Sequence, residues 1–393
     1  MFNKNKINKS NSIDLFFDIR NSSVGVGVVE KNEESSLISY TNRKYLSSNK
    51  KQDPKTFIES IYKILDEIIE ELNKDDISKE KFFKKIDEVY CVLASPWYGN
   101  SIENISYEEK NTKTFTKDYL NKKLKNNKTI NKNNSVIENE IISIFLNGYN
   151  VKDPFNKEFQ DVKLSFYKSS INKRIKREIE DKIKSNFKTK KITFHTHPLL
   201  LLNVLRSNFY SVNDFSLFDI GAEVTEISIF NDGIYKEFIT LPNGFNYLTR
   251  DLLEDENSTK NNALSKIKLI SEGDILDSKI ENKLIKSAEE WFKDFTKIRK
   301  DKSEKISHNI FIISDNDFKN PLHKIFNNKK FFSEILKINT EPIIRILDSE
   351  HTKDLAIYKD NIQKDPLISM IYNFSTGNKD WFLKKFGNIY RYG

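Results

Sequence analysis

The sequence predicts a two-lobed α/β protein. The chain has 393 residues, which is more than one hydrophobic core usually supports. Two segments far apart in the chain, 13–30 and 217–238, share one pattern, in which an apolar strand ends in an aspartate, crosses a short turn and returns as a second strand. Helices and a further apolar strand follow each segment, so each segment can begin a lobe of its own.

The composition indicates a globular chain with a very polar surface. Hydrophobic residues make up 37% of the sequence, charged residues 31%, and the formal charge is +8. The lysine and asparagine cluster at 121–134 has no interleaved aromatic residues, so we interpret it as a solvated loop and expect no nucleic-acid partner. One cysteine, Cys91, and the absence of a signal-peptide or membrane-spanning pattern predict a cytoplasmic protein.

The first lobe is predicted at 13–101, after a disordered tail at 1–12. Its predicted elements are strands at 13–19, 24–30 and 36–41, an amphipathic helix at 55–73, and a buried strand from 87 that stops at Pro96. At 102–188 the pattern of predicted strands and helices changes, and this predicts an inserted α+β subdomain. Strands are expected there at 103–107, 140–146 and 160–167, with helices from 115 and at 171–187.

The chain is then predicted to return to the first lobe at 189–214, through a strand that breaks at Pro198 and an apolar helix between the lobes. His195 and His197 lie two apart on this strand and would project to one face, as two metal ligands could. Packing or hydrogen bonding at the strand end is the alternative that we favour. The second lobe is predicted at 215–364, with helices at 246–254, 260–272 and 278–298, a strand at 309–313 and a helix from 321.

The two strand–aspartate–turn units are the candidate site. In the second unit Asp219 leads into a turn through Gly221, and in the first Asp18 leads into Asn21-Ser22-Ser23. A carboxylate beside a turn of exposed N–H groups can hold Mg²⁺ through water next to a bound phosphate. An ordinary hairpin is the alternative for either unit alone.

The order of these parts resembles the FtsA/PilM branch of the actin-like ATPases, within the superfamily of actin, sugar kinases and heat-shock chaperones. Segments 15–29 and 217–229 resemble the two phosphate motifs, and 102–188 lies where the family carries its SHS2-type subdomain, with the Asn-Gly-Tyr turn at 147–149. His197-Pro198-Leu199 and the stretch 233–252, with Gly244, Thr249 and Asp251, also match in order.

The resemblance implies a nucleotide site between two lobes of an actin-like fold with an inserted SHS2-type subdomain. Asp18 and Asp219 would be the catalytic acids that hold Mg²⁺ through water, and His197 stands where the family often carries its water-orienting residue. The residues that would contact ATP are Arg20, Asn21, Ser22, Ser23, Gly221, Ala222, Glu223, Thr225, Gly244, Ser314 and Asn316.

The sequence also departs from the family pattern. Arg20 stands where the first phosphate turn carries a glycine, and Ser314 with Asp315 replaces the glycine pair beneath the base. Arg20 could block the phosphate or supply a fixed cation to it. Two alternatives therefore stay open beside an ATP-binding scaffold, namely a nucleotide-free structural protein of the same fold and a small-molecule kinase.

The C-terminal segment 365–393 is predicted to be a linker followed by a basic amphipathic tail. Trp381, Phe382 and Phe386 with Lys384 and Lys385 would contact a membrane as the tail of FtsA does. Packing of the tail on its own domain is the alternative. The resemblance as a whole implies a bacterial scaffold that assembles a cell-division or pilus-type complex at the inner membrane, with protein partners and self-association.

Overall fold

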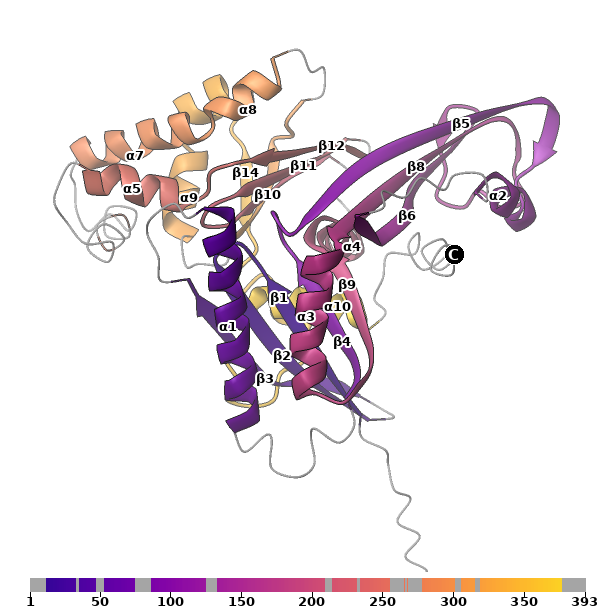
Figure 1. Ribbon diagram of the computed structural model, residues 1–393. Helices are drawn as coiled ribbons and strands as arrows, with labels where there is room; N and C mark the ends of the chain where they lie inside the picture. The colour runs from indigo at the N-terminus through magenta and orange to yellow at the C-terminus, as the bar shows by residue number, and fades with distance from the viewer. Residues whose placement is uncertain are drawn as a thin grey trace, which may run out of the picture.

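The computed structural model describes most of the chain, and the described residues form three β-sheets (Figure 1). The described residues are 12–32, 35–46, 53–74, 86–124, 133–208, 214–231, 234–254, 265, 267, 278–300, 305–314 and 319–376. The expected tail at 1–12, apart from Ser12, most of the expected helix at 260–272 and the amphipathic tail from 377 onward lie outside them.

The first lobe is built on a five-stranded sheet with helices on both faces. Its strands, in the order β3-β2-β1-β4-β9, are β3 (Ser36–Tyr45), β2 (Ser23–Lys31), β1 (Ser12–Ile19), β4 (Ile86–Leu93) and β9 (Thr189–Thr196). Helices α1 (Pro54–Lys74) and α3 (Lys173–Asn186) cover one face, and α4 (His197–Asn208) and α10 (Pro366–Ser375) cover the other. Along β1, Leu15 and Phe17 pack towards the first pair of helices and Phe16 towards the second, because neighbouring strand residues face opposite sides.

The second lobe repeats this strand order. Its strands, in the order β12-β11-β10-β13-β14, are β12 (Ile234–Leu241), β11 (Thr225–Asn231), β10 (Phe215–Ile220), β13 (Asn309–Ser314) and β14 (Ile343–Ile346). In both lobes an antiparallel hairpin and a third antiparallel strand are followed by two parallel strands. The outer layer comprises α5 (Asn246–Glu254), α7 (Ser278–Trp291), α8 (Lys293–Ile298), α9 (Lys319–Phe326) and the turn Phe331–Ile335. A short helical turn, Lys353–Leu355, leads back to the first lobe.

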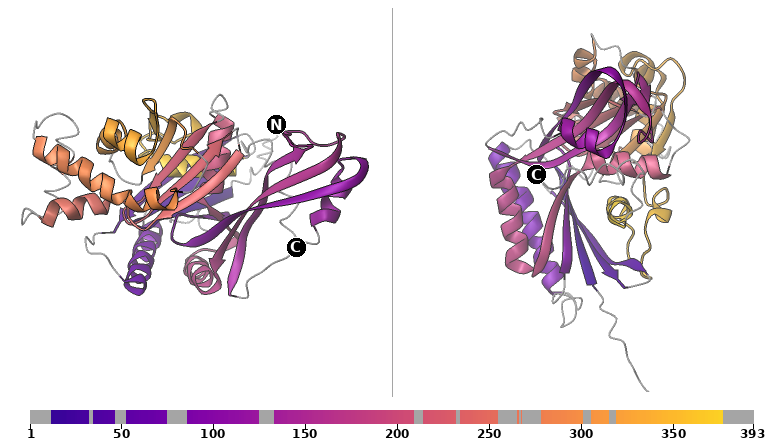
Figure 2. Two further views of the ribbon diagram at one scale, coloured as in Figure 1. Left: turned by 90° about the horizontal axis from the view of Figure 1, so that it is seen from above. Right: turned by 90° about the vertical axis from the view of Figure 1, so that its right-hand side faces the viewer.

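A third sheet projects from the junction of the lobes (Figures 1 and 2). Its strands, in the order β5-β8-β6-β7, are β5 (Tyr98–Thr114), β8 (Glu158–Asn172), β6 (Asn134–Leu146) and β7 (Tyr149–Asn150). Helix α2 (Lys117–Leu124) packs on it and closes a separate small core. Asn147 and Gly148 form the turn between β6 and β7 with φ of 51° and 82°.

Three boundaries differ from the sequence-based expectation. The inserted sheet begins at Tyr98, since β5 pairs with β8 from that residue onward. Helix α3 packs on the first lobe beside α1, because its apolar stripe, Ile179 and Ile183, joins the core of that lobe. The expected linker after 365 contains helix α10, whose residues from Leu367 to Phe374 are buried.

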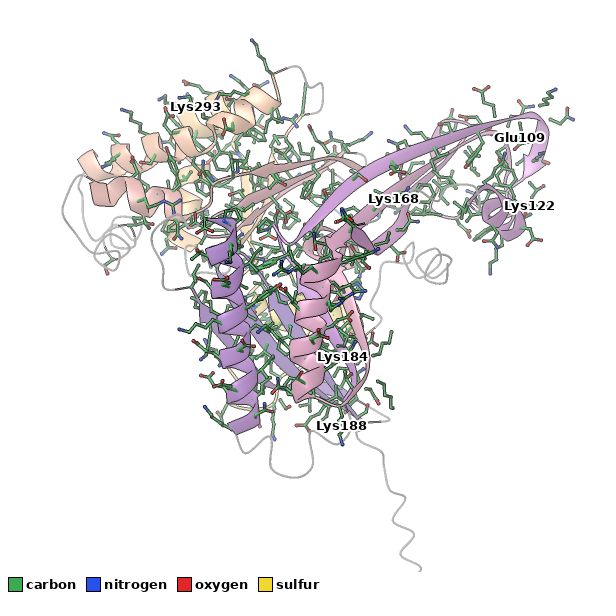
Figure 3. All side chains as sticks on the ribbon, viewed as in Figure 1. Glu109, Lys122, Lys168, Lys184, Lys188 and Lys293 are labelled. Atoms are coloured by element: carbon green, nitrogen blue, oxygen red, sulfur yellow. The ribbon has the colours of Figure 1, made fainter. Side chains whose placement is uncertain are left out.

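Exposed lysines are distributed over all three parts of the molecule, as the labelled residues in Figure 3 illustrate. Many of them pair with a nearby carboxylate, as Lys184 does with Glu180 and Lys190 with Asp87. Within the described part of the chain, no helix combines the length and apolar character needed to cross a membrane.

Candidate functional site between the lobes

The two hairpin turns face each other where the lobes meet. Each turn is closed by the same kind of backbone hydrogen bond, from Arg20 N–H to Ser23 O and from Gly221 N–H to Val224 O, both at 3.0 Å. The start of α5 contacts the second turn, since Phe245 N–H donates to Gly221 O at 3.0 Å. The fold therefore brings Asp18 and Asp219, at the ends of β1 and β10, to the same place.

An ion-pair network joins the two aspartates through His197 and Arg20. His197 Nε2 lies 2.7 Å from Asp18 Oδ1, and His197 Nδ1 lies 3.0 Å from Asp219 Oδ2. Arg20 Nη2 pairs with Asp219 Oδ1, and Arg20 Nη1 lies 3.5 Å from Asp219 Oδ2 and 3.0 Å from His197 Nδ1. All four side chains are buried, so the lobes are tied together by charges that are shielded from water.

Arg43 adds a second cation from β3. Its Nη2 lies 2.8 Å from Asp18 Oδ2, and its Nε and Nη2 donate to the two oxygens of Asp365 at 2.7 and 3.1 Å. Asp365 also caps α10 by accepting from Leu367 N–H at 2.9 Å. With His197 charged, three cations and three carboxylates balance. We refer to Asp18, Arg20, Arg43, His197, Asp219 and Asp365 as the interlobe network.

The network fixes the protonation of its members. Burial disfavours a charged imidazole, but Asp18 and then Asp219 outweigh burial and raise the pKa of His197 to about 9. Burial likewise raises carboxylate pKa values, but Arg20 and then His197 outweigh it and lower the pKa of Asp219 to about 2. Arg43, followed by His197, holds the pKa of Asp18 well below its ordinary value in the same way. A pKa of about 9 favours the imidazolium at neutral pH, with one N–H donated to Asp18 and the other to Asp219, and Arg20 Nη1, itself a donor, then lies beside Nδ1 without a hydrogen bond to it.

Side chains fill the space between the two turns. Asn21 Oδ1 accepts from Glu223 N–H of the second turn at 3.1 Å, while Asn21 Nδ2 donates to Ser95 O at 3.2 Å. A Cβ built on Gly221 would overlap the amide of Asn21, and one built on Gly244 would overlap the backbone of Gly221 and Ala222. The two glycines therefore allow the second turn to contact Asn21 of the first turn and the start of α5 to contact the second turn.

This arrangement does not fit Mg–ATP. Both aspartates form ion pairs with Arg20, Arg43 or His197, and Arg20 is 1% exposed in the position where the resemblance places a phosphate. Among the described residues, no group of three or more potential ligands from His, Cys, Asp and Glu is placed to hold a metal ion. His197 begins helix α4 rather than continuing β9, so it does not form a strand-face pair with His195.

The other predicted residues are distributed around the network. Ser23 Oγ accepts from Arg43 at 3.1 Å, Thr225 Oγ1 donates to Asn243 O at 2.9 Å, and Glu223 pairs with Arg250 at 2.9 Å. Ser22 is buried in the first turn and Ala222 in the second. Asn316 lies outside the described residues.

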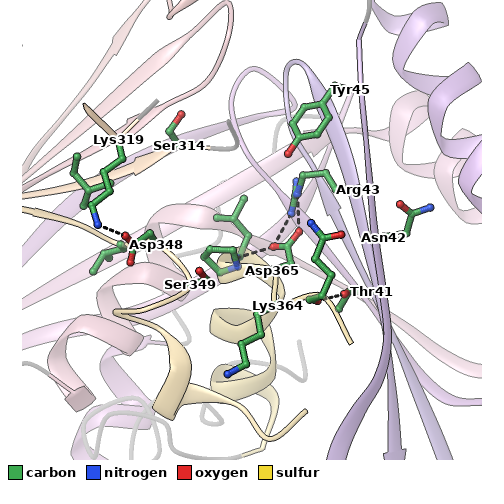
Figure 4. Close-up of a pocket in the computed structure, with 15 residues that line it drawn as sticks. Thr41, Asn42, Arg43, Tyr45, Ser314, Lys319, Asp348, Ser349, Lys364 and Asp365 are labelled. Carbon is green, nitrogen blue, oxygen red and sulfur yellow. Dashed lines mark hydrogen bonds and ion pairs between the residues drawn. The ribbon is translucent and has the colours of Figure 1, made fainter. Parts of the chain in front are cut away.

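An open pocket of about 340 Å³ lies beside the network, and Ser314 lines it (Figure 4). Strand β3 forms one wall, through Thr41, Asn42, Arg43 and Tyr45. The opposite wall contains Lys319, which pairs with Asp348 at 2.7 Å. The start of α10 forms the rest of the lining. Residues from both lobes therefore meet around this space.

Sequence reasoning missed Arg43, Asp365 and Glu226. Glu226 is buried on β11 opposite Asp219, and burial followed by repulsion from Asp219 raises its pKa to about 7. The structure connects Arg43 with Gly25, because a Cβ on Gly25 would overlap its guanidinium. The glycine at 25 in β2 therefore makes room for an arginine on the neighbouring strand.

The strand order and the paired hairpins define an actin-like fold, and comparison with solved structures confirms it. The chain is similar to the PilM protein of a structure described as the PilM-PilN type IV pilus biogenesis complex, with a TM-score of 0.51 and 10% sequence identity, over 93% of this chain and 98% of that one. The predicted resemblance to PilM-type proteins is thus confirmed at the level of the fold.

Two other solved structures are similar over most of their length. MreB 5 of Spiroplasma citri bound to AMPPNP has 9% identity and a TM-score of 0.44, over 93% of this chain and 95% of that one. Ethanolamine utilization protein EutJ from Carboxydothermus hydrogenoformans has 10% identity and a TM-score of 0.41, over 87% and 86%. No protein-family model and no curated protein matches the sequence.

Proposed function

We propose that this chain is a non-hydrolysing actin-fold scaffold whose lobes are held by its own ion pairs instead of by Mg–ATP. The observation that carries the proposal is the interlobe network. His197 bridges Asp18 and Asp219 while Arg20 pairs with Asp219. Removing one partner of a buried ion pair leaves the other charge uncompensated, so a metal ion that took either aspartate from its cations would have to offset that cost.

Nucleotide binding tests this function. We expect no saturable binding of a fluorescent ATP analogue with Mg²⁺, up to millimolar nucleotide, by the wild-type chain. Asp219→Ala probes the network, and Asp294→Ala, which changes an exposed carboxylate on α8, is the matched control. Micromolar binding by wild type and Asp294→Ala that Asp219→Ala abolishes would contradict the proposal.

That contradictory result would support a second candidate, an ATP-dependent switch. The specific observation in its favour is the convergence of Asp18, Asp219 and Gly221 beside an open pocket that contains Ser314. In this case Arg20 and Asn21 would have to leave the space between the turns when nucleotide enters.

We further propose that the scaffold assembles a pilus- or division-type complex at the cytoplasmic side of a membrane. The similarity in fold to PilM, in a complex with PilN, supports a role with protein partners. The projecting inserted sheet offers the surface, and the tail that contains Trp381 and Phe386 offers the membrane contact. Liposome co-sedimentation of the full chain and of a chain ending at 377 tests the contact, because equal pelleting of both would exclude a role for the tail.

A further inference from the structure

The chain enters the inserted sheet through a short connector, Ser95 to Tyr98, which follows β4 and ends at the first residue of β5. This connector is attached to the first hairpin turn at two points. Trp97 Nε1 donates to Arg20 O at 2.9 Å, and Ser95 O accepts from Asn21 at 3.2 Å. Arg20, whose side chain pairs with Asp219 in the interlobe network, therefore also binds the base of the inserted sheet through its backbone oxygen.

The same connector is attached to the second lobe. Tyr98 OH lies 2.8 and 3.0 Å from the two carboxylate oxygens of Glu226. Glu226 lies directly opposite Asp219 in the pairing of β10 with β11. The four residues from Ser95 to Tyr98 thus contact Arg20 and Asn21 of the first turn and Glu226, the strand partner of Asp219.

A second attachment of the inserted sheet reaches His197. Thr196 N–H donates to Glu138 of β6 at 3.1 Å, and Thr196 Oγ1 lies 2.8 Å from Tyr167 OH of β8. Thr196 directly precedes His197 in the chain. The Tyr167 ring also stacks on Tyr235 of the second lobe, with ring centroids 6.1 Å apart.

We propose that the interlobe network controls the orientation of the inserted sheet relative to the second lobe. This orientation should change when the network is broken. Separating the lobes pulls Asp219 from Arg20 and Glu226 from Tyr98 together, because Asp219 and Glu226 are paired on adjacent strands. Arg20, Glu226 and Thr196 are buried, so water does not replace their lost hydrogen bonds without larger rearrangement. This coupling goes beyond the proposed function and does not depend on whether nucleotide binds.

Electron-spin distance measurements test the coupling. Spin labels at Tyr149→Cys, on the tip of the inserted sheet, and Lys293→Cys, on α8, are both at exposed positions, while the native Cys91 is buried and unlabelled. We expect one narrow distance distribution in the otherwise wild-type chain. Asp219→Asn, in the network, and Tyr98→Phe, which removes only the connector hydroxyl, should each broaden or shift it.

The matched control changes the inserted sheet far from its base. Glu109→Gln disrupts a cluster with Lys123 and Tyr119 near α2 and should leave the distance distribution unchanged. If Asp219→Asn does not fold, as judged by circular dichroism, Arg20→Lys replaces it. A wild-type distribution in the folded network variant and in Tyr98→Phe would overturn the proposal, and so would an equal broadening by Glu109→Gln.

Discussion

Arg20 is the residue that most changes what the site can do. Its guanidinium pairs with Asp219 across the lobes, in a setting that is 1% exposed. Truncating one partner of a buried ion pair costs far more than the pair contributes, because the other charge remains buried without compensation. The same side chain therefore occupies the position where the resemblance places a phosphate, and its removal should be costly.

Arg20→Met should lower the free energy of unfolding by about 3–5 kcal/mol, since it removes one of the two cations that pair with the buried carboxylate of Asp219. Urea denaturation measures this loss. Arg174→Met removes an exposed arginine that pairs with Glu178 on α3, and should change stability by less than about 1 kcal/mol. An equal loss in the free energy of unfolding for the two substitutions would contradict a stabilising role of the buried Arg20–Asp219 ion pair.

His197 should be doubly protonated at neutral pH, because each ring nitrogen faces a carboxylate and its pKa is raised to about 9. Nitrogen-15 NMR of histidine-labelled protein distinguishes an imidazolium from either neutral tautomer. The spectrum of His197→Gln assigns the resonance among the five histidines of the chain. A neutral-tautomer signal for His197 at pH 7 would contradict this charge assignment.

At the scale of elements, the start of α5 lies directly on the second hairpin turn. Gly244 permits this contact, since a Cβ there would overlap the backbone of Gly221 and Ala222. Gly244→Ala should therefore destabilise the protein by about 1–3 kcal/mol, the usual range for overpacking. Thermal and urea unfolding measure the loss. Gly99→Ala is the matched control, because no atom lies within 4 Å of a Cβ built there, and a similar loss at both positions would refute the close contact.

Helices and strands were easier to predict from the sequence than the parts of the molecule on which they pack. The hairpin strands were predictable because aspartates and turn residues interrupt long apolar runs, and α1 because its buried residues recur at helical spacing. Which sheet a helix covers depends on contacts between distant segments, so the helix at 171–187 was predicted in the inserted subdomain, and the segment that forms α10 was predicted as a linker.

The candidate site was predictable to a similar extent. Asp18, Asp219 and His197 are brought together as the resemblance implies. Arg43 and Asp365 could not be found in this way, because their pairing joins positions 322 residues apart in sequence. Neither residue belongs to a motif that the resemblance supplies.

At the scale of the whole molecule, the network makes stability depend on pH. The folded-state pKa of His197 is raised from about 6.5 to about 9, so its stabilising contribution is complete below pH 6.5 and is lost as the pH rises through 9. Glu226 acts in the same direction at lower pH, because burial raises its pKa to about 7. Between pH 4.5 and pH 7 its carboxyl group ionises in the unfolded chain before it does so in the folded one, and this lowers the free energy of unfolding. Asp219, with a lowered pKa of about 2, loses its contribution only as the pH falls from about 3.8 through 2.

The free energy of unfolding should therefore fall by roughly 3 kcal/mol on account of His197 between pH 6.5 and pH 9, the amount that its pKa shift implies. Urea denaturation across this range measures the slope. His197→Gln should be less stable than wild type at pH 6 and should lose most of the slope, whereas His308→Asn, at an exposed position on the second lobe, should keep it. A wild-type stability that is constant or rises from pH 6.5 to pH 9 would mean that the lobes are not held by a charged histidine between two carboxylates.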